Sequence, residues 1–302
     1  MRILFVTSTY IGDAVLSTLV LNHLLARHPG ARVTIACGPQ AAPLFARVPG
    51  LERLIELRKR RADLHWVGLW RQVVGTRWDV AVDLRGSALT LLIPARRRLI
   101  MRGGRRPGHR ARYLGRLLGL ATPPLPTVWF TEEDRARATA ALPPGAPYLV
   151  LAPTANWPDK MWPGERFAAL ARALGPDLPG ARPVVLAGPG KAERDRAATL
   201  LAALPEAVDL VGRLSLTEVG ALLAGAALFV GNDSGLSHLA AAAGCPTLCL
   251  FGPTDPVGAA PLGRAAAWIG APGAPAAPME ALELAPVVAA ARALLGRPRP
   301  AP

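Results

Sequence analysis

The sequence has few cysteines, and it contains no apolar run long enough to cross a membrane. Only three of the 302 residues are cysteines, none of them has the spacing of zinc ligands, and all lie in apolar segments. This is typical of buried thiols in a reducing cytosol. The longest run of small and apolar residues, 219–231, is shorter than the ~20 residues that span a bilayer. These absences argue against a disulfide-stapled domain, a zinc module and an integral membrane protein.

Two common nucleotide-binding motifs are also absent. No Asp-x-Asp pair occurs, so a divalent metal that bridges a nucleotide diphosphate has no obvious ligands. Gly12 and Asp13 are too sparse for the G-x-G-x-x-G fingerprint of dinucleotide-binding proteins. If the ligand is a nucleotide diphosphate, a lysine and helix N-termini must therefore carry its charge.

Acidic residues are scarce in the first half of the chain. Residues 1–145 hold 23 Lys and Arg against 9 Asp and Glu, whereas residues 146–302 hold 12 of each kind. The net charge of +14 thus belongs to the first half, which either faces an acidic partner or carries a solvated basic surface. Nucleic acid is not the expected partner, because the basic stretches lack interleaved aromatic residues and the second half is neutral.

Strand-like and helix-like segments alternate along the chain in two series. Continuous apolar runs, typical of strands buried on both faces, are followed by apolar residues at helical spacing. The expected strands are 2–9, 32–37, 53–57 and 79–84, and then 148–153, 183–188, 208–212, 227–232 and 246–252. Such alternation predicts parallel sheets with right-handed crossovers. We expect an α/β protein with two doubly wound domains, residues 1–142 and 148–302, the second ending in a helix, and a ligand site in the cleft between them.

Polar residues open and close an otherwise small and apolar stretch, residues 231–255. Asp233 and Ser234 fall where an expected strand ends and an Ala-rich helix begins. A helix start carries unpaired N–H groups and partial positive charge, so it is either capped by one of these side chains or binds an anion such as phosphate. Gly235 would let a ligand approach the backbone. His238, about one turn further on, has either a structural or a ligand-binding role.

Two other loops between a strand and a helix carry candidate side chains. Lys160 lies between Trp157 and Trp162, and Pro163 opens the following helix. This lysine is either solvated or neutralises a phosphate as a point charge. Glu193 follows the next strand and interacts either with the helix dipole or with a ligand.

The first half offers one carboxylate of the right type for a general base. Asp13 follows the first strand, where it is either the N-cap of the next helix or a base at the edge of the sheet. Asp83 and Arg85 end the fourth expected strand. Further basic groups lie in or beside loops of this half, at 58–61, 96–98 and 102–112.

Three motifs, in the same order along the chain, resemble those of the bacterial heptosyltransferases of glycosyltransferase family 9. They are residues 4–24, 156–171 and 212–256, and residues 78–87 form a weaker fourth match. The third motif is the most specific of them. Together, the four matches are spread over nearly the whole chain except its C-terminal end. The resemblance implies the GT-B fold, with two Rossmann-like domains that face a central cleft. It also implies inverting, metal-independent glycosyl transfer.

The resemblance also assigns roles to individual residues. It makes Asp13 the catalytic base and Lys160 the phosphate-binding lysine. Glu193 matches the ribose-binding carboxylate, and Leu214 matches an apolar shelf for the nucleobase. The other donor-binding residues that it implies are Asn156, Asp233, Ser234, Gly235 and His238. One departure concerns the acceptor, since many members have a basic residue near Thr7 and this chain has none.

The expected reaction moves a heptose or a related sugar from an ADP-sugar to a lipopolysaccharide core acceptor, an anionic glycolipid. No metal or other cofactor is expected. The basic groups at 58–61, 96–98 and 102–112 are expected to attract this acceptor and the inner-membrane surface. The residues expected to bind the acceptor are Arg58, Lys59, Arg60, Arg61 and Arg85. Alternatives are the same chemistry on another glycan or on a protein, and nucleotide-sugar epimerisation on the same scaffold. The expected location is the cytoplasm, peripheral on the cytoplasmic face of the inner membrane.

Overall fold

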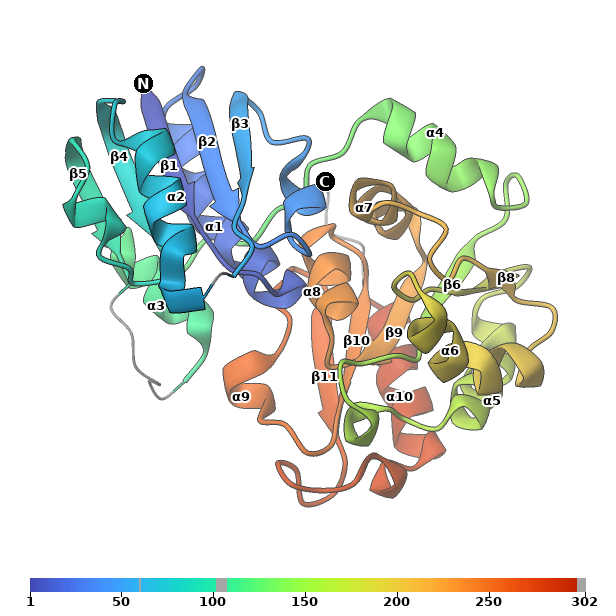
Figure 1. Cartoon of the computed structure of the whole chain (residues 1–302). Coiled ribbons are helices and arrows are strands. Elements are labelled where there is room, and N and C mark those ends of the chain that lie inside the picture. Colours follow the sequence, from blue (N-terminus) through green and yellow to red (C-terminus); the bar gives the residue numbers. More distant parts are fainter. Residues whose placement is uncertain (60, 102–107, 298–302) are drawn as a thin grey trace. The chain divides into compact units, whose positions relative to one another are not determined.

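The computed structural model describes residues 1–59, 61–101 and 108–297 (Figure 1). Contacts divide the chain into two compact units, Met1–Trp129 and Phe130–Pro302. Each unit contains one parallel sheet whose strands alternate with helices, so the predicted α/β class is confirmed. No helix in the described ranges is both long and apolar enough to span a bilayer.

The first unit is built on a five-stranded sheet with the order β3-β2-β1-β4-β5. All neighbouring strands are parallel, and the order reverses between β1 and β4, which makes the sheet doubly wound. The strands are β1 (Arg2–Val6), β2 (Arg32–Cys37), β3 (Leu51–Glu56), β4 (Trp78–Asp83) and β5 (Ala95–Ile100). The helices are α1 (Ile11–Arg27), α2 (Leu64–Val73) and α3 (Arg110–Leu117), with 3-10 turns η1 (Ala42–Phe45), η2 (Arg61–Asp63) and η3 (Leu89–Leu91).

Helices cover both faces of this sheet, as the continuous apolar runs predict. On one face α2 and η3 pack together, because Leu69 of α2 and Leu89 of η3 belong to one buried cluster with Leu4 and Val6 of β1. On the opposite face lie α1 and α3, which contact each other (Figure 1). The core of the unit therefore consists of two apolar layers, one on each side of the strands.

The edge strand β5 is one that the apolar pattern does not predict, because its sequence ARRRLI has the composition of a basic loop. It pairs with β4 at the edge of the sheet and leaves Arg96 exposed, which is typical of edge strands. Arg98 donates to the carbonyl oxygens of Thr90, Ile93 and Ala95 at 2.7–2.9 Å. This arginine thereby fixes the crossover that contains η3.

The second unit has a six-stranded sheet with the order β11-β10-β9-β6-β7-β8, again parallel throughout. The strands are β6 (Tyr148–Ala152), β7 (Arg182–Val185), β8 (Val208–Asp209), β9 (Leu228–Asn232), β10 (Thr247–Phe251) and β11 (Ala266–Gly270). The α-helices are α4 (Glu132–Ala140), α5 (Gly164–Ala173), α6 (Lys191–Ala203), α7 (Leu216–Gly225), α8 (Gly235–Ala242), α9 (Pro256–Ala259) and α10 (Leu284–Leu295). The 3-10 turns are η4 (Pro158–Lys160), η5 (Gly175–Asp177) and η6 (Met279–Ala281).

Three helices share one face of the second sheet. Phe167 of α5, Leu200 of α6 and Val287 of α10 belong to one buried cluster with strand residues such as Leu151 and Val230. The helices α7 and α8 contact each other and complete the other layer. The strand order reverses between β6 and β9, so this sheet too is doubly wound.

The contacts group α4 with the second unit, whereas the limits predicted from the sequence place it in the first domain. Helix α4 contacts α7, and Thr217 Oγ1 donates to Asp134 Oδ1 at 3.1 Å. Asp134 also completes a capping box with Thr131 at the start of α4. A Pro- and Gly-rich linker at 142–147 is visible in the sequence, but a contact between two helices far apart along the chain is not.

Candidate active site

In each sheet, two of the predicted site residues follow the strands at which the strand order reverses. Asp13 and Arg85 follow β1 and β4, and Lys160 and Asp233 follow β6 and β9. Open α/β sheets bind their ligands beyond the C-terminal ends of the strands, at this reversal. Each unit therefore has a group of candidate residues at the position where its own fold favours a ligand.

The central feature of the second unit is an ion pair between Lys160 and Asp233. Lys160 Nζ lies 2.5 Å from Asp233 Oδ2, and Thr254 Oγ1 donates to the same oxygen at 2.9 Å. The two charged side chains are only 14% and 9% exposed, so water screens the pair weakly. The ammonium group also lies 5.4 Å from the centre of the Trp157 ring. Lys160 is thus fixed among protein groups.

The start of α8 follows directly on this ion pair. Ser234 is the N-cap residue, yet its side chain makes no hydrogen bond to the helix. Among the described residues, its Oγ is a buried oxygen without a hydrogen-bond partner. Gly235 is the first residue of the helix and is partly exposed. The helix start therefore has unused donors next to a lysine, an arrangement that favours an anion.

A second set of contacts links β9 to the loop after β6. Asn232 accepts a hydrogen bond from the backbone N–H of Trp162 at 3.0 Å and donates to the carbonyl oxygen of Pro153 at 2.7 Å. Trp162 is buried, whereas Trp157 is exposed and its ring contacts the ammonium group of Lys160. The two tryptophans beside the lysine thus differ, since one belongs to the core and the other to the surface. His238 is buried within α8.

Glu193 lies in the first turn of α6, and neighbouring loops orient its carboxylate. Thr154 Oγ1 donates to Glu193 Oε2 at 2.7 Å, and Arg196 Nη1 lies 2.9 Å from Oε1. The backbone N–H of Gly188 donates to Oε2 at 3.4 Å. The side chain is therefore tied to the loops after β6 and β7, at the same edge of the sheet as Lys160.

The two remaining predicted donor residues also lie in loops at this edge. Leu214 follows β8 and is partly buried, directly before Ser215, the N-cap of α7. Asn156 follows β6 and is exposed. All predicted donor-binding residues thus lie at the C-terminal edge of the second sheet.

In the first unit, Asp13 pairs with an arginine from another helix. The N-cap of α1 is Tyr10, and Asp13 lies in the first helical turn, so the N-cap interpretation of Asp13 is wrong. Arg110 Nη1 of α3 lies 2.7 Å from Asp13 Oδ1, while Ser8 Oγ lies 3.5 Å from Oδ2. Both charged side chains are about one-third exposed, at 32% and 35%.

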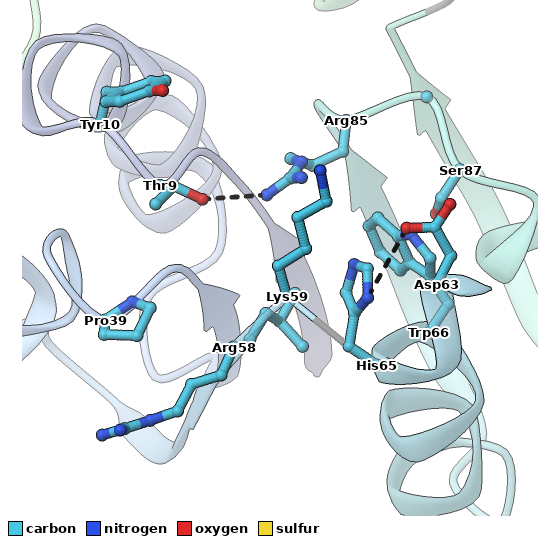
Figure 2. A pocket seen from close by; sticks show the side chains of 12 residues that line it. Thr9, Tyr10, Pro39, Arg58, Lys59, Asp63, His65, Trp66, Arg85 and Ser87 are labelled. Atoms are coloured by element: carbon cyan, nitrogen blue, oxygen red, sulfur yellow. Dashed lines mark hydrogen bonds and ion pairs between the residues drawn. The ribbon is translucent and has the colours of Figure 1, made fainter. Parts of the chain in front are cut away.

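A pocket of about 820 Å³ opens at the C-terminal edge of the first sheet (Figure 2). Its lining residues come from the loops after β1, β2, β3 and β4 and from the start of α2. Arg58, Lys59 and Arg85 line it together with one carboxylate, that of Asp63. This charge balance suits an anionic ligand.

The side chains in this pocket form two groups. Arg85 Nη1 donates to Thr9 Oγ1 at 3.2 Å, and its guanidinium lies 5.5 Å from the centre of the Trp66 ring. Figure 2 shows the Lys59 side chain pointing toward Arg85, whereas Arg58 points away from both. A planar guanidinium on an aromatic face is fixed in orientation, which favours carboxylate or phosphate recognition.

The other group consists of a buried histidine and its neighbouring carboxylate. His65 Nδ1 lies 3.8 Å from Asp63 Oδ1, and the histidine side chain is only 7% exposed. Asp63 has the left-handed backbone conformation (φ 53°) that non-glycine residues rarely adopt. Of the other predicted acceptor residues, Arg61 is exposed in η2 and is not among the residues that line the pocket. Arg60 lies outside the described residues.

Several partners of the candidate residues are not predicted from the sequence, among them Arg110, Arg196, Thr254 and Thr154. Arg110 belongs to the basic segment 102–112, but nothing in that segment distinguishes the arginine that reaches Asp13. Thr254 lies in the polar end of the stretch 231–255, which was a usable signal. Thr154 lies just beyond Pro153 at the end of β6, where polar residues indicate a site.

Comparison with known proteins finds relatives over most of this chain. Residues 109–283 match the model of the family described as glycosyltransferase family 9 (heptosyltransferase). Lipopolysaccharide heptosyltransferase 1 of Pseudomonas aeruginosa is 31% identical, over 89% of this chain and 84% of the relative.

Solved structures support the fold. A glycosyl transferase family 9 structure from Veillonella parvula is similar, with a TM-score of 0.80, 19% identity and 97% of each chain covered. The E. coli heptosyltransferase WaaC, solved with ADP, is similar with a TM-score of 0.76 and 23% identity, over 97% of this chain and all of the other. The expected GT-B fold class is thus confirmed.

Proposed function

The chain belongs to glycosyltransferase family 9, and we propose that it transfers a heptose from ADP-heptose to a lipopolysaccharide core acceptor. It is a glycosyltransferase, as its motifs predict. The proposed donor and acceptor follow the lipopolysaccharide heptosyltransferase activity of the 31% identical relative and the ADP in the similar E. coli structure. The single observation that best supports the proposal is the shielded Lys160–Asp233 pair at the start of α8.

In this proposal the diphosphate of the donor binds at the start of α8. Lys160 supplies the positive charge, and the backbone N–H groups at Ser234 and Gly235 supply hydrogen bonds. Asp233 and Trp157 hold the ammonium in position before the donor arrives, so little reorganisation is needed as charge develops on the leaving diphosphate. His238, one turn further along the same helix, completes this side of the site.

The nucleoside occupies the edge beside the diphosphate. Glu193, which Thr154 and Arg196 already orient, accepts hydrogen bonds from the ribose hydroxyls. Leu214 supplies an apolar surface for the adenine, and Asn156 contributes a polar contact from the loop after β6. Because Lys160 and a helix start carry the phosphate charge, the proposed reaction is independent of metal.

Asp13 acts as the general base in the proposed mechanism. It accepts the proton of the acceptor hydroxyl while that oxygen attacks the anomeric carbon of the heptose. The bond to the ADP oxygen breaks on the opposite side, so the configuration is inverted and ADP leaves. Arg110 occupies Oδ1 of Asp13, which leaves Oδ2 as the oxygen that accepts the proton.

The acceptor binds in the pocket of the first unit, where Lys59, Arg85 and Arg58 meet its acidic groups. Since that acceptor is a membrane lipid, we propose that the protein works in the cytoplasm as a peripheral protein on the inner membrane. The excess of basic residues in the first half supports this placement.

A panel of donors and acceptors tests the proposal. The protein is incubated with ADP-heptose, ADP-glucose or UDP-glucose, each with and without truncated lipopolysaccharide, and released nucleotide is measured. We expect release from ADP-heptose only with an acceptor present, unchanged by EDTA. Release of ADP without any acceptor, a second product from the donor alone, or a requirement for magnesium would contradict it.

A further inference from the structure

We propose that an exposed apolar face of the first unit docks onto the surface of an anionic phospholipid bilayer. This face consists of Leu64, Val67 and Trp70 on α2 and Leu91 and Leu92 at η3, and is called the α2–η3 face below. The inference rests on the proposed function, because a lipid-linked acceptor has to be reached at a membrane. It goes further by naming the surface that makes the contact.

The first observation is that this face concentrates exposed apolar side chains. Of the ten exposed large apolar residues in the described part of the chain, five belong to it, with exposures of 54%, 45%, 37%, 65% and 62% in chain order. Single exposed apolar residues are normal, but a contiguous group marks an interaction surface.

The five residues form one surface because α2 and η3 lie side by side. Trp70 Nε1 donates to the carbonyl oxygen of Leu92 at 3.0 Å, which joins the two elements. Both elements also bury their inner side chains, Leu69 and Leu89, in one cluster on the same face of the sheet. Leu64, Val67 and Trp70 recur at three-residue spacing and so share the outer side of α2.

The second observation is the charge of the segments that carry this face. Residues 64–74 and 84–99 together contain five arginines and no acidic residue. Arg71 and Arg96 are exposed, Arg96 Nη1 lies 3.4 Å from Asp79 Oδ1 outside these segments, and Arg98 holds the crossover through three carbonyl oxygens. An apolar surface with surrounding arginines is typical of proteins that lie on anionic lipid, because the apolar side chains enter the headgroup region and the cations attract the phosphates.

Charge also decides between the bilayer and a second copy of this chain. A second copy would present the same arginine-rich face, and like charges across an interface are unfavourable. A bilayer with anionic headgroups supplies the opposite charge, and Trp70 has the amphipathic ring that favours the boundary between lipid and water. The bilayer is therefore the occupant that fits both the apolar and the charged part of the surface.

The third observation is continuity with the acceptor pocket. His65 and Trp66 at the start of α2 line that pocket, and so do Arg85 and Ser87, which lie in the segment between β4 and η3. Both elements of the α2–η3 face thus begin at the pocket. Docking through this face would bring the pocket next to the headgroup layer, where a lipid-linked sugar is found.

The test measures binding to vesicles without donor or acceptor. Vesicles of phosphatidylglycerol and phosphatidylethanolamine are compared with vesicles of phosphatidylcholine alone by co-sedimentation. The wild type is compared with Leu91→Glu/Leu92→Glu, with Val67→Glu as an independent change on α2. Val257→Glu in the second unit is the matched control, because that side chain is 63% exposed.

We expect the wild type and Val257→Glu to bind the anionic vesicles equally. Binding of the double variant should fall at least about 10-fold, and that of Val67→Glu several-fold, because charged groups replace apolar ones at the headgroup boundary. Turnover on a soluble, deacylated acceptor should stay unchanged in all variants, which separates docking from chemistry.

Three results would overturn the inference. One is wild-type binding to anionic vesicles that none of the α2–η3 variants weakens. Another is an absence of vesicle binding by the wild type. The third is a wild-type oligomer that the double variant dissociates, which would assign the face to a second copy. If vesicles bind as expected but no heptose is transferred to any acceptor, the proposed function fails while the docking surface stands.

Discussion

Arg110 and Asp13 form an ion pair in which Arg110 Nη1 lies 2.7 Å from Asp13 Oδ1. The two residues are 97 positions apart in the sequence and come from α3 and α1. Among the residues that the structure describes, the contact of Oδ2 is a long one of 3.5 Å from Ser8 Oγ. In the proposed mechanism, this oxygen accepts the proton of the acceptor hydroxyl.

Removal of this arginine should slow the reaction without weakening donor binding. We expect Arg110→Ala to lower kcat by about 10–100-fold, because Asp13 loses the partner that fixes its orientation. The KM for the donor should stay unchanged, since the pair belongs to the first unit. Arg112→Ala removes an exposed arginine of the same helix and serves as the control. Equal kcat values for the two variants would mean that Arg110 is only a surface residue.

Lys160→Ala should weaken binding of nucleotide diphosphates far more than binding of nucleosides. The lost partner is a charge that interacts with phosphate, so we expect the Kd for ADP to rise about 10–100-fold and the Kd for adenosine to change little. Calorimetry with the two ligands measures the difference. Lys191→Ala, which removes an exposed lysine from the start of α6, is the control. A similar loss for ADP and adenosine would point to a structural role for Lys160.

The positions of these residues, but not their pairings, follow from the sequence. The sequence points to Lys160 because it lies beside two tryptophans in a loop between a strand and a helix, and to Asp233 because it lies where a strand ends and a helix begins. Their ion pair depends on the path of the loop after β6, which Asn232 fixes through the backbone of Trp162. A contact across 70 residues leaves no periodic signal in one sequence.

Arginine-rich composition conceals two other features. Arg110 is one of several arginines in 102–112, and the sequence does not distinguish the one that contacts Asp13 from the others. Strand β5 was missed for the same reason, since an edge strand with one face in solvent tolerates the run ARRRLI. The domain limits predicted from the sequence differ from the limits of the two compact units, because α4 packs on α7. The composition of the linker does not reveal this contact.

The basic pocket should make acceptor binding sensitive to salt. We expect the KM of the anionic acceptor to rise several-fold with ionic strength in the wild type, because salt screens partly exposed charges. The rise should be much smaller in Arg58→Gln/Lys59→Gln, while the donor KM stays nearly flat. Arg135→Gln/Arg137→Gln in α4 is the control. Salt curves that match in all three proteins would mean that the first-unit cations do not meet the acceptor.

The three cysteines should resist alkylation in the native protein. Burial, and secondly the Glu56 carboxylate, raise the pKa of Cys37 to about 12. Burial, and secondly Asp233, hold the pKa of Cys249 well above its usual range. Since the thiolate is the reactive form, these raised pKa values keep both groups protonated at pH 8. Mass spectrometry should show no iodoacetamide adduct before denaturation and three after it, with Cys245 also buried. Rapid labelling of Cys37 or Cys249 in the folded protein would contradict this.

The most direct test of the account is the mass of the acceptor after reaction. Heptose-free core lipopolysaccharide is incubated with ADP-heptose and the protein, and the molecular mass of the lipopolysaccharide is measured by mass spectrometry. We expect a gain of one heptosyl residue with the wild type, and a rate about 10²–10⁴-fold lower with Asp13→Asn, which keeps the shape of the side chain but cannot accept the proton. Two results would contradict the proposal. An acceptor whose mass stays unchanged while ADP-heptose is consumed would exclude heptosyl transfer to it, and an Asp13→Asn variant as fast as the wild type would exclude Asp13 as the general base.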